Sequence, residues 1–335
     1  MSSTGPGCAP PAPAATGPSP AEGDRAIPGT ARHRAAYLRP MRDSQRKRRW
    51  RTALCATLIG LVPAQVALPA EPAQAFAPDL SFVPSPIPLG VQTHRSITEH
   101  AVTQALGSYF GVAEPTPRMR AAIEEIVAAD KAVDDDQVSS DKHFDGENFD
   151  GGQRFVLANR AALLAALTAG DGAAARGRLG TALHPIQDFY AHSNWVELGN
   201  RGPDPDLGVP GRVIGPVAGI LENTCTLGGI LITTKLTSGY YGGEDRVPLV
   251  LASKCRHGGP LDSGPGSGGI SKDFPVSILS PHPGLHQVAA QVAEQATRKF
   301  LDEIRAAVPA WQSQLLLGAD LTFGPAGASR STRPA

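Results

Sequence analysis

The chain has 335 residues, with 31 Lys and Arg against 31 Asp and Glu, and 41% of its residues are hydrophobic. This length suffices for one globular domain of about 200 residues plus a long leader. The balanced charge argues against a strongly basic nucleic-acid binder, and we expect no stable nucleic-acid complex.

Residues 1–75 predict a disordered leader that contains an export signal. The basic stretch QRKRRWR is followed by the apolar run TALCATLIGLV, and small residues at Ala73 and Ala75 form a cleavage site. The apolar run is short and is interrupted by Pro63, so it does not predict a stable membrane anchor. We expect cleavage after Ala75 and a secreted, extracellular protein without a transmembrane anchor.

The position of the signal is unusual, because about forty residues rich in Pro, Gly and Ala precede Met41. Either Met41 is the true start, or the chain carries a disordered cytoplasmic extension. After the signal we expect a linker over 76–91, a helical metal-binding domain over 92–317 and a disordered tail over 318–335.

The first helix of the domain is predicted over residues 96–110. Ser96 and Glu99 match a capping box at its start, and Gly111 is a typical helix stop. His94 lies at the mouth of this helix, where its imidazole could serve as a metal ligand.

A second helix is predicted from Thr116 and Pro117 to about Val133. Its end is acidic, although the helix dipole disfavours negative charge there, which indicates a cationic partner. Among these carboxylates, the spacing favours Asp130 as the candidate metal ligand. For at least two of the three carboxylates over 134–136, we expect a solvated acidic turn.

The polar segment DKHFDGENFD comes next and contains His143, a further candidate ligand. A third helix is predicted over 152–169, where Gly170 stops it, and a fourth over 173–192.

The fourth helix carries His184, Asp188 and His192 at four-residue intervals, so the three side chains share one stripe. His184 and Asp188 can hold one ion, and the second carboxylate oxygen can bridge to another, which favours zinc. The alternative is two hydrogen-bonded histidines with Asp188 orienting one of them. Pro185 is expected to kink or restart the helix, and if it begins a new helix, His184 becomes the cap of that helix.

Residues 200–280 are rich in Gly and Pro and predict long loops around the helices. Within them, the apolar segment 228–241 is either a short hairpin or an irregular loop. Leu285 to Val308 predicts a long amphipathic helix, with Trp311 packing after it.

Cysteine usage agrees with export. Cys8 and Cys55 lie in the leader, which leaves Cys225 and Cys255 to form a disulfide. Its loop of about thirty residues is worth about 3 kcal/mol. His257 is expected to be a loop residue beside this disulfide.

The order of these motifs resembles a known family. His94 in HRSIT, Asp130 thirteen residues before His143, and the helix in LGTALHPIQDFYAHSNWVELGN resemble the zinc-dependent phospholipase C and P1-nuclease superfamily. The phrases HFDGENF, KCRHGGPLD, GGISKDF and SPHPGLHQVAAQVAEQAT are more similar to its Het-C and von Willebrand factor A domain-containing protein 7 type of N-terminal domain. The resemblance covers residues 92 to about 307.

The resemblance implies a mostly α fold, a multi-helix bundle with long Gly- and Pro-rich loops, that holds more than one Zn²⁺. The expected metal ligands are His94, Asp130, His143, His184, Asp188, His192, His282 and His286. We expect the catalytic carboxylate that accepts a proton to be Asp130 or one of Asp134 to Asp136, with Asp130 and Asp134 as the named candidates.

The chain departs from the phospholipase pattern in two places. That pattern begins with a mature N-terminal Trp whose amine binds metal, but the only Trp before His94 is Trp50, inside the signal. It also has a His six residues after the helix Asp, where this chain has Asn194, and a later HxxxE that is absent here. His192 is the nearest substitute, and His282 and His286 are the late candidates.

The predicted function is a secreted zinc-dependent phosphoesterase, phospholipase C-like, which hydrolyses a phosphodiester, including phospholipid, with metal-activated water. The alternative is a non-catalytic secreted structural or recognition module with a partial metal site. A metal-free helical protein is the third possibility.

Overall fold

The computed structural model describes residue 76 and residues 90–226, 230–241, 252–259 and 268–319. These residues fall within the compact unit formed by residues 65–335. The predicted leader, most of the linker and most of the tail lie outside them.

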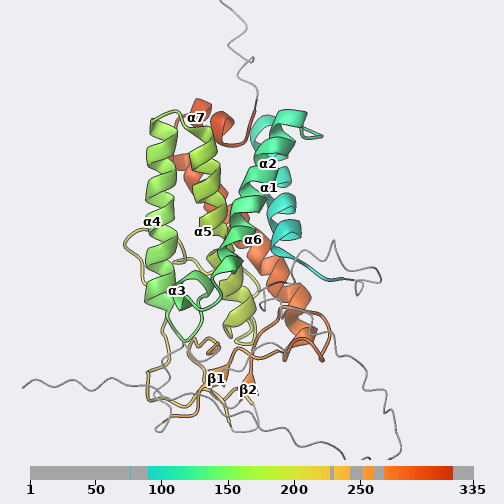
Figure 1. Cartoon of the computed structure of the whole chain (residues 1–335). Coiled ribbons are helices and arrows are strands. Elements are labelled where there is room, and N and C mark those ends of the chain that lie inside the picture. The colour runs from blue at the N-terminus through green and yellow to red at the C-terminus, as the bar shows by residue number, and fades with distance from the viewer. Residues whose placement is uncertain (1–75, 77–89, 227–229, 242–251, 260–267, 320–335) are drawn as a thin grey trace, which may run out of the picture. The chain divides into compact units, whose positions relative to one another are not determined.

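The fold is mostly α-helical, as predicted (Figure 1). Its elements in chain order are α1 (His94–Phe110), α2 (Pro117–Lys131), the 3₁₀ helix η2 (Ala132–Asp135), α3 (Ser140–His143), α4 (Phe149–Thr168), α5 (Gly172–His192), β1 (Cys255–Arg256), β2 (Gly268–Gly269), the 3₁₀ helix η3 (Pro283–Leu285), α6 (His286–Ala307) and α7 (Ala310–Leu316).

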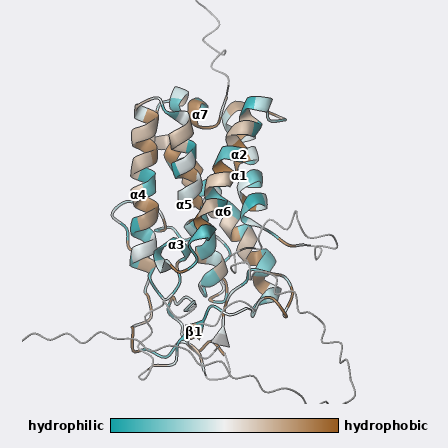
Figure 2. Ribbon diagram, in the orientation of Figure 1, coloured by the Kyte–Doolittle hydropathy of each residue, from teal (hydrophilic) through white to brown (hydrophobic). Residues whose placement is uncertain are grey.

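Helix α5 is the centre of the bundle. It packs against α4, α2 and α6, and α1 lies against α6 and α2 (Figure 1). From Leu179 to His192 every residue of α5 except Thr181 is buried. In contrast, α6 buries a single face. Figure 2 shows that polar and apolar residues are interleaved along the helices. Polar side chains on α5 are therefore held inside the protein.

Helix α1 begins two residues earlier than predicted. Its N-cap is Thr93, whose hydroxyl accepts a hydrogen bond from the Ser96 backbone, while the Ser96 hydroxyl accepts one from the Thr93 backbone. The reciprocal pair is therefore Thr93 and Ser96, and the predicted pair of Ser96 and Glu99 is wrong, because Glu99 pairs with Arg95. Gly111 stops the helix in the left-handed conformation, as predicted.

Helices α2 and α5 approach each other closely at Gly180. A Cβ atom there would lie 2.1 Å from the backbone oxygen of Ile126, closer than any real contact. The absence of a side chain lets the backbones meet one turn before Asp130 on α2 and one turn before His184 on α5. This contact sets the distance between the two polar side chains.

Helix α5 continues through Pro185 without a break. The expected restart is wrong, and His184 lies inside the helix. Packing against neighbours on several sides outweighs the one backbone hydrogen bond that proline removes.

Below the bundle, long segments form what we call the loop layer: residues 193–226, 230–241, 252–259 and 268–285. Segment 228–241 is irregular where it is described, with isolated bridges from Leu231 to Cys225 and from Tyr240 to Arg256. The predicted disulfide between Cys225 and Cys255 is present. Together with Ile270 these cysteines form a small apolar cluster of their own.

Two fully buried lysines hold the loop layer: Lys254 fastens it to the segment before α4, and Lys272 joins two of its own segments. Lys254 Nζ lies 2.7 Å from Glu147 Oε2, just before α4, and Lys272 Nζ lies 2.8 Å from Glu197 Oε1. Each lysine also donates to backbone oxygens.

The expected packing of Trp311 is wrong. Its side chain is 47% exposed, because α7 turns Gln312, Ser313 and Leu316 inward instead. None of the described helices is long and apolar enough to cross a membrane.

Candidate metal centre

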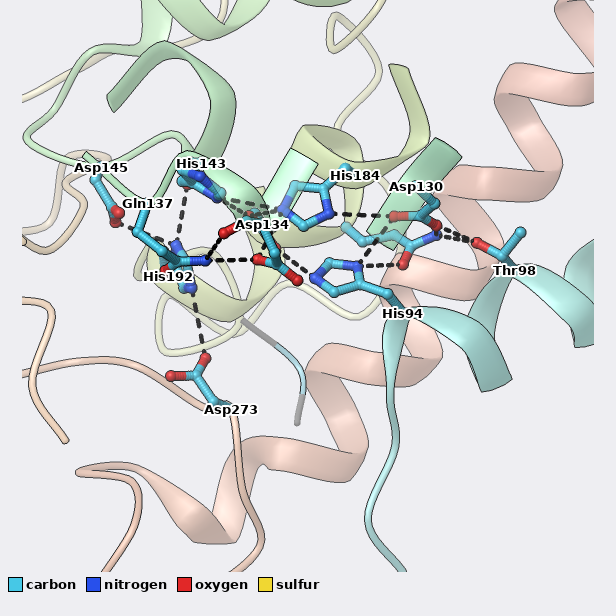
Figure 3. Close-up of polar contacts among 12 residues, drawn as sticks. His94, Thr98, Asp130, Asp134, Gln137, His143, Asp145, His184, His192 and Asp273 are labelled. Carbon is cyan, nitrogen blue, oxygen red and sulfur yellow. Dashed lines mark hydrogen bonds and ion pairs between the residues drawn. The ribbon is translucent and has the colours of Figure 1, made fainter. Parts of the chain in front are cut away.

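Buried histidines and aspartates gather where the start of α1, the end of α2 and the middle of α5 meet (Figure 3). The group consists of His94, Asp130, Asp134, His143, His184 and Asp188. None of these residues is more than 3% exposed. Burial of so many ionisable groups is costly unless opposite charges or a metal ion compensate.

Four of them surround a single point. His184 Nε2 lies 3.1 Å from Asp188 Oδ2, 3.2 Å from His143 Nδ1 and 3.5 Å from Asp134 Oδ1. His143 Nδ1 lies 2.9 Å from Asp188 Oδ2. In a tetrahedral zinc site with bonds of about 2.0–2.1 Å, ligand atoms are about 3.3 Å apart. The spacing of these four side chains fits such a site.

Asp188 also faces His94. Its other oxygen, Oδ1, lies 3.1 Å from His94 Nε2, and neither atom has a hydrogen-bond partner among the described residues. The two oxygens of this carboxylate thus point to two neighbouring positions. That is the geometry of a carboxylate that bridges two metal ions.

In each imidazole, the ring nitrogen that faces away from the cluster lies within hydrogen-bond distance of an oxygen atom. His94 Nδ1 lies 2.8 Å from Gln187 Oε1, and His143 Nε2 lies 2.9 Å from the backbone oxygen of Asp136. His184 Nδ1 lies 3.2 Å from Asp130 Oδ1. When the outer N–H donates to these acceptors, the inner nitrogen presents a lone pair, as metal-binding histidines do.

Without a metal, charge pairing within the group compensates for burial. Burial alone raises the pKa of Asp188, but His184 and His94 outweigh it and hold this pKa well below its usual range. Burial lowers the pKa of His184, but Asp188 and Asp134 outweigh it and raise the pKa well above the usual value. A metal ion would take the place of protons here, so binding would release them.

The two candidate carboxylates occupy different positions. Asp134 lies beside the inward nitrogen of His184, and burial raises its pKa. It is buried, whereas Asp135 in the same acidic run is exposed. Asp130 lies behind His184, where its Oδ2 accepts a hydrogen bond from Thr98. Asp130 therefore orients an imidazole and does not face the common point.

The remaining predicted ligands lie elsewhere. His192 lies one turn beyond Asp188 and faces a second group of polar residues. His282 is partly exposed and lies 2.7 Å from Glu197. In His286 both ring nitrogens are taken, by the Lys272 oxygen and the Gln92 backbone. The structure does not bring these last two into the cluster.

The position of this cluster in the chain agrees with a known domain. A family model described as VWA7 N-terminal domain matches residues 97–312. The chain belongs to the VWA7 N-terminal domain family. The matched range contains every member of the cluster except His94, which lies three residues before it.

The similar proteins are longer than this chain. It is 41% identical over 212 residues to von Willebrand factor A domain-containing protein 7 of Rattus norvegicus, and 40% identical over 212 residues to that of Homo sapiens. Each match covers 59% of this chain but 23% of the relative, so the chain spans less than a quarter of their length. No solved structure matches the chain.

In this VWA7 N-terminal domain, three residues near His192 were not predicted as ligands: Asp145, His257 and Asp273. Each lies in a phrase that carries the resemblance, HFDGENF, KCRHGGPLD or GGISKDF. A search of those phrases for His and Asp would have found them. Spacing could not, because they come from separate loops.

Proposed function

We propose that this domain is a secreted zinc-dependent phosphoesterase, phospholipase C-like, that hydrolyses a phosphodiester. Support comes from the cluster of histidines and aspartates and from the resemblance of its motifs to zinc phospholipases and P1 nucleases. The relatives' names describe no activity, so the proposal rests on the site.

The single observation that carries the proposal is that the two oxygens of Asp188 face different numbers of possible metal ligands. On one side, His143, His184 and Asp134 complete a set of four side chains with Oδ2. On the other, His94 is the described residue whose ring nitrogen lies 3.1 Å from Oδ1. Structural zinc sites are closed by four protein ligands, whereas catalytic sites keep a position for water or substrate. The His94 side offers such a position.

Zinc bound there would supply a Lewis acid and a water of lowered pKa. The protein's part is to hold the ligands still: Asp130 orients His184, Gln187 orients His94, and Asp188 would offer one oxygen to each side. Of the two carboxylates expected to accept a proton, Asp134 belongs to the set of four side chains around Oδ2 and Asp130 orients His184, so we assign the role to neither.

A further ligand for the His94 side is the amine that signal cleavage would create. Cleavage after Ala75 would make Phe76 the first residue. The Phe76 ring is fully buried, and its centroid lies 5.8 Å from that of His94 in an edge-on contact. A terminal amine at this residue would substitute for the N-terminal Trp amine of the phospholipase pattern.

The test is to purify the secreted chain over residues 76–335, measure its zinc content, and assay a chromogenic phosphodiester and phosphatidylcholine vesicles. Asp188→Asn should lose metal and at least a hundredfold in activity. Asp135→Asn, in the exposed part of the acidic run, should keep both. Zinc-loaded protein that is inactive on phosphodiesters, phospholipids, phosphomonoesters and nucleic acid would overturn the proposal and leave a metal-binding module.

A further inference from the structure

Behind the metal cluster, buried polar side chains from four helices meet around one amide. Gln187 on α5 carries this amide, and Thr98 on α1, Thr297 on α6 and Asp130 on α2 surround it. All four residues are fully buried. Polar groups buried this completely take their hydrogen bonds from one another, so the direction of each bond can be worked out from the partners.

The two threonine hydroxyls have their protons committed elsewhere. Thr98 Oγ1 lies 2.6 Å from Asp130 Oδ2, and an ionised carboxylate only accepts, so the hydroxyl donates there. Thr297 Oγ1 lies 2.9 Å from the backbone oxygen of Ala293, which also only accepts. A hydroxyl that has given its one proton offers lone pairs to any further neighbour. Both threonines therefore act as acceptors toward Gln187.

These acceptors fix the orientation of the Gln187 amide. Its Nε2 lies 2.7 Å from Thr98 Oγ1 and 3.4 Å from Thr297 Oγ1. Asp130 Oδ2, also 3.4 Å away, is a third acceptor on the same side. An amide turned the other way would place its carbonyl oxygen against three acceptors, so the NH₂ group belongs on this side. The carbonyl oxygen is then directed at His94.

The amide in turn fixes the tautomer of His94. Gln187 Oε1 lies 2.8 Å from His94 Nδ1, and because an amide oxygen only accepts, Nδ1 carries the proton. In the neutral ring, Nε2 is then the nitrogen with the lone pair, and it faces Asp188 Oδ1 at 3.1 Å. A neutral imidazole binds metal through that lone pair.

We propose that Thr98 and Thr297 are positioning residues: they fix the Gln187 amide, and the amide sets the metal-binding tautomer of His94. Both act through other side chains, in the way that outer partners of metal-binding histidines fix the ring and its proton. The inference rests on the metal-binding part of the proposed function and is independent of the phosphoesterase reaction.

Thr98 differs from Thr297 because it also reaches a second histidine. Asp130 accepts the Thr98 proton at Oδ2, and its other oxygen, Oδ1, lies 3.2 Å from His184 Nδ1. Figure 3 shows Thr98 beside Asp130 at one end of the cluster. Loss of the Thr98 hydroxyl should therefore disturb both imidazoles, whereas loss of the Thr297 hydroxyl should disturb His94 alone.

The test compares Thr98→Val and Thr297→Val in the secreted chain over residues 76–335, because valine keeps the shape of threonine and removes the hydroxyl. NMR of isotope-labelled histidine in zinc-free protein, at a pH where the rings are neutral, reports which ring nitrogen carries the proton. The parent should show His94 with its proton on Nδ1. Thr297→Val should shift this tautomer toward Nε2, and Thr98→Val should do the same while also changing the signals of His184.

Zinc affinity is the second readout, measured by competition with a chromogenic chelator. It should fall about 10–100-fold in Thr98→Val, and less in Thr297→Val because the contact of Thr297 with Gln187 is longer. Thr98→Ser returns the hydroxyl and should restore both readouts. Thr168→Val, at an exposed threonine of α4, is the control and should change neither.

Far-UV circular dichroism checks that each variant keeps the helical bundle, and if Thr98→Val does not fold, Thr297→Val carries the test by itself. A parent protein with the His94 proton on Nε2, or nitrogen signals and zinc affinity that stay unchanged in the folded valine variants, would overturn the proposal. Zinc-loaded parent that is inactive on every phosphoester would overturn the proposed function and leave this inference in place, so the two failures are distinguishable.

Discussion

Asp188 Oδ2 lies 3.1 Å from His184 Nε2, one helical turn earlier in α5, inside the stretch 182–192, in which every residue is buried. A charged pair in this position is stable only when further charges or ligands surround it. Here His94, His143 and Asp134 do so, which makes this pair the point around which the site is arranged.

Asp130 is expected to act on metal binding through His184. Asp130→Asn keeps the size of the side chain but weakens the acceptor for His184 Nδ1. Loss of an outer partner typically lowers metal affinity about 10–100-fold. Competition with a chromogenic chelator measures the affinity, and Asp135→Asn is the exposed control. An unchanged affinity would mean that Asp130 does not orient the ligand.

The N-terminal amine can be tested by extension. A chain that begins with Gly-Ser ahead of Phe76 moves the terminal amine two residues away from Phe76, while the buried ring can stay in place. We expect lower zinc content or weaker affinity than in the chain that begins at Phe76, with the same circular dichroism. Equal zinc binding by the two chains would remove the amine from the ligand set.

Gly180 should tolerate no side chain. Gly180→Ala places a methyl group 2.1 Å from the Ile126 oxygen, so α2 and α5 must separate. We expect a loss of about 1–3 kcal/mol in the free energy of unfolding. Gly177→Ala, one turn earlier with no atom within 4 Å of the new Cβ, should be neutral or stabilise by about 0.5–1 kcal/mol. Urea denaturation measures both, and equal effects would contradict the close approach.

Glu197 should stabilise the protein in a pH-dependent way. Burial alone raises its pKa, but Lys272 and His282 outweigh burial and hold the pKa below the ordinary value of 4.5. The stabilisation is therefore present above pH 4.5 and is lost as the pH falls through the folded-state pKa. Glu197→Gln should cost about 3 kcal/mol at pH 7, because Lys272 stays buried, and the difference from the parent should shrink below pH 4.

Denaturation at several pH values measures this difference. Glu222→Gln is the matched control, since Glu222 binds Lys235 at the surface and should change stability little. A Glu197→Gln deficit that stays constant down to pH 3 would show that the carboxylate charge is not responsible.

The disulfide should stabilise the loop layer. Replacing both Cys225 and Cys255 by Ser opens a loop with a sequence separation of 30 and should cost about 3 kcal/mol. Thermal denaturation of the variant and of the reduced parent protein should agree. A variant as stable as the oxidised parent would show that other contacts, such as the buried Lys254 and Glu147 pair, hold the layer.

Most helices could be predicted from the sequence because their signals are local. Gly111 and the Thr116–Pro117 start mark helix ends through the backbone conformations that those residues favour. Periodicity placed α4, α5 and α6 within a few residues of their observed bounds. The i, i+4 spacing of His184 and Asp188 likewise predicts that they share a face, since both lie on one helix.

Other features depended on contacts between distant segments. Choosing Thr93 over Ser96 as the N-cap, or continuing α5 through Pro185, required knowledge of how the chain packs. Asp130 and Asp134 look alike in sequence. The turn from α2 into η2 directs one behind His184 and the other beside its inner nitrogen.

Short-range signals therefore specify a mostly helical domain with a metal-competent stripe on one helix and a disulfide in its loops, because helix propensity, spacing and cysteine pairing act over short range or by count. Which side chains meet at one point depends instead on how distant segments pack. His257 and Asp273 reach His192 through loops whose paths follow from packing, buried lysine pairs and the disulfide, and no local pattern encodes those distances.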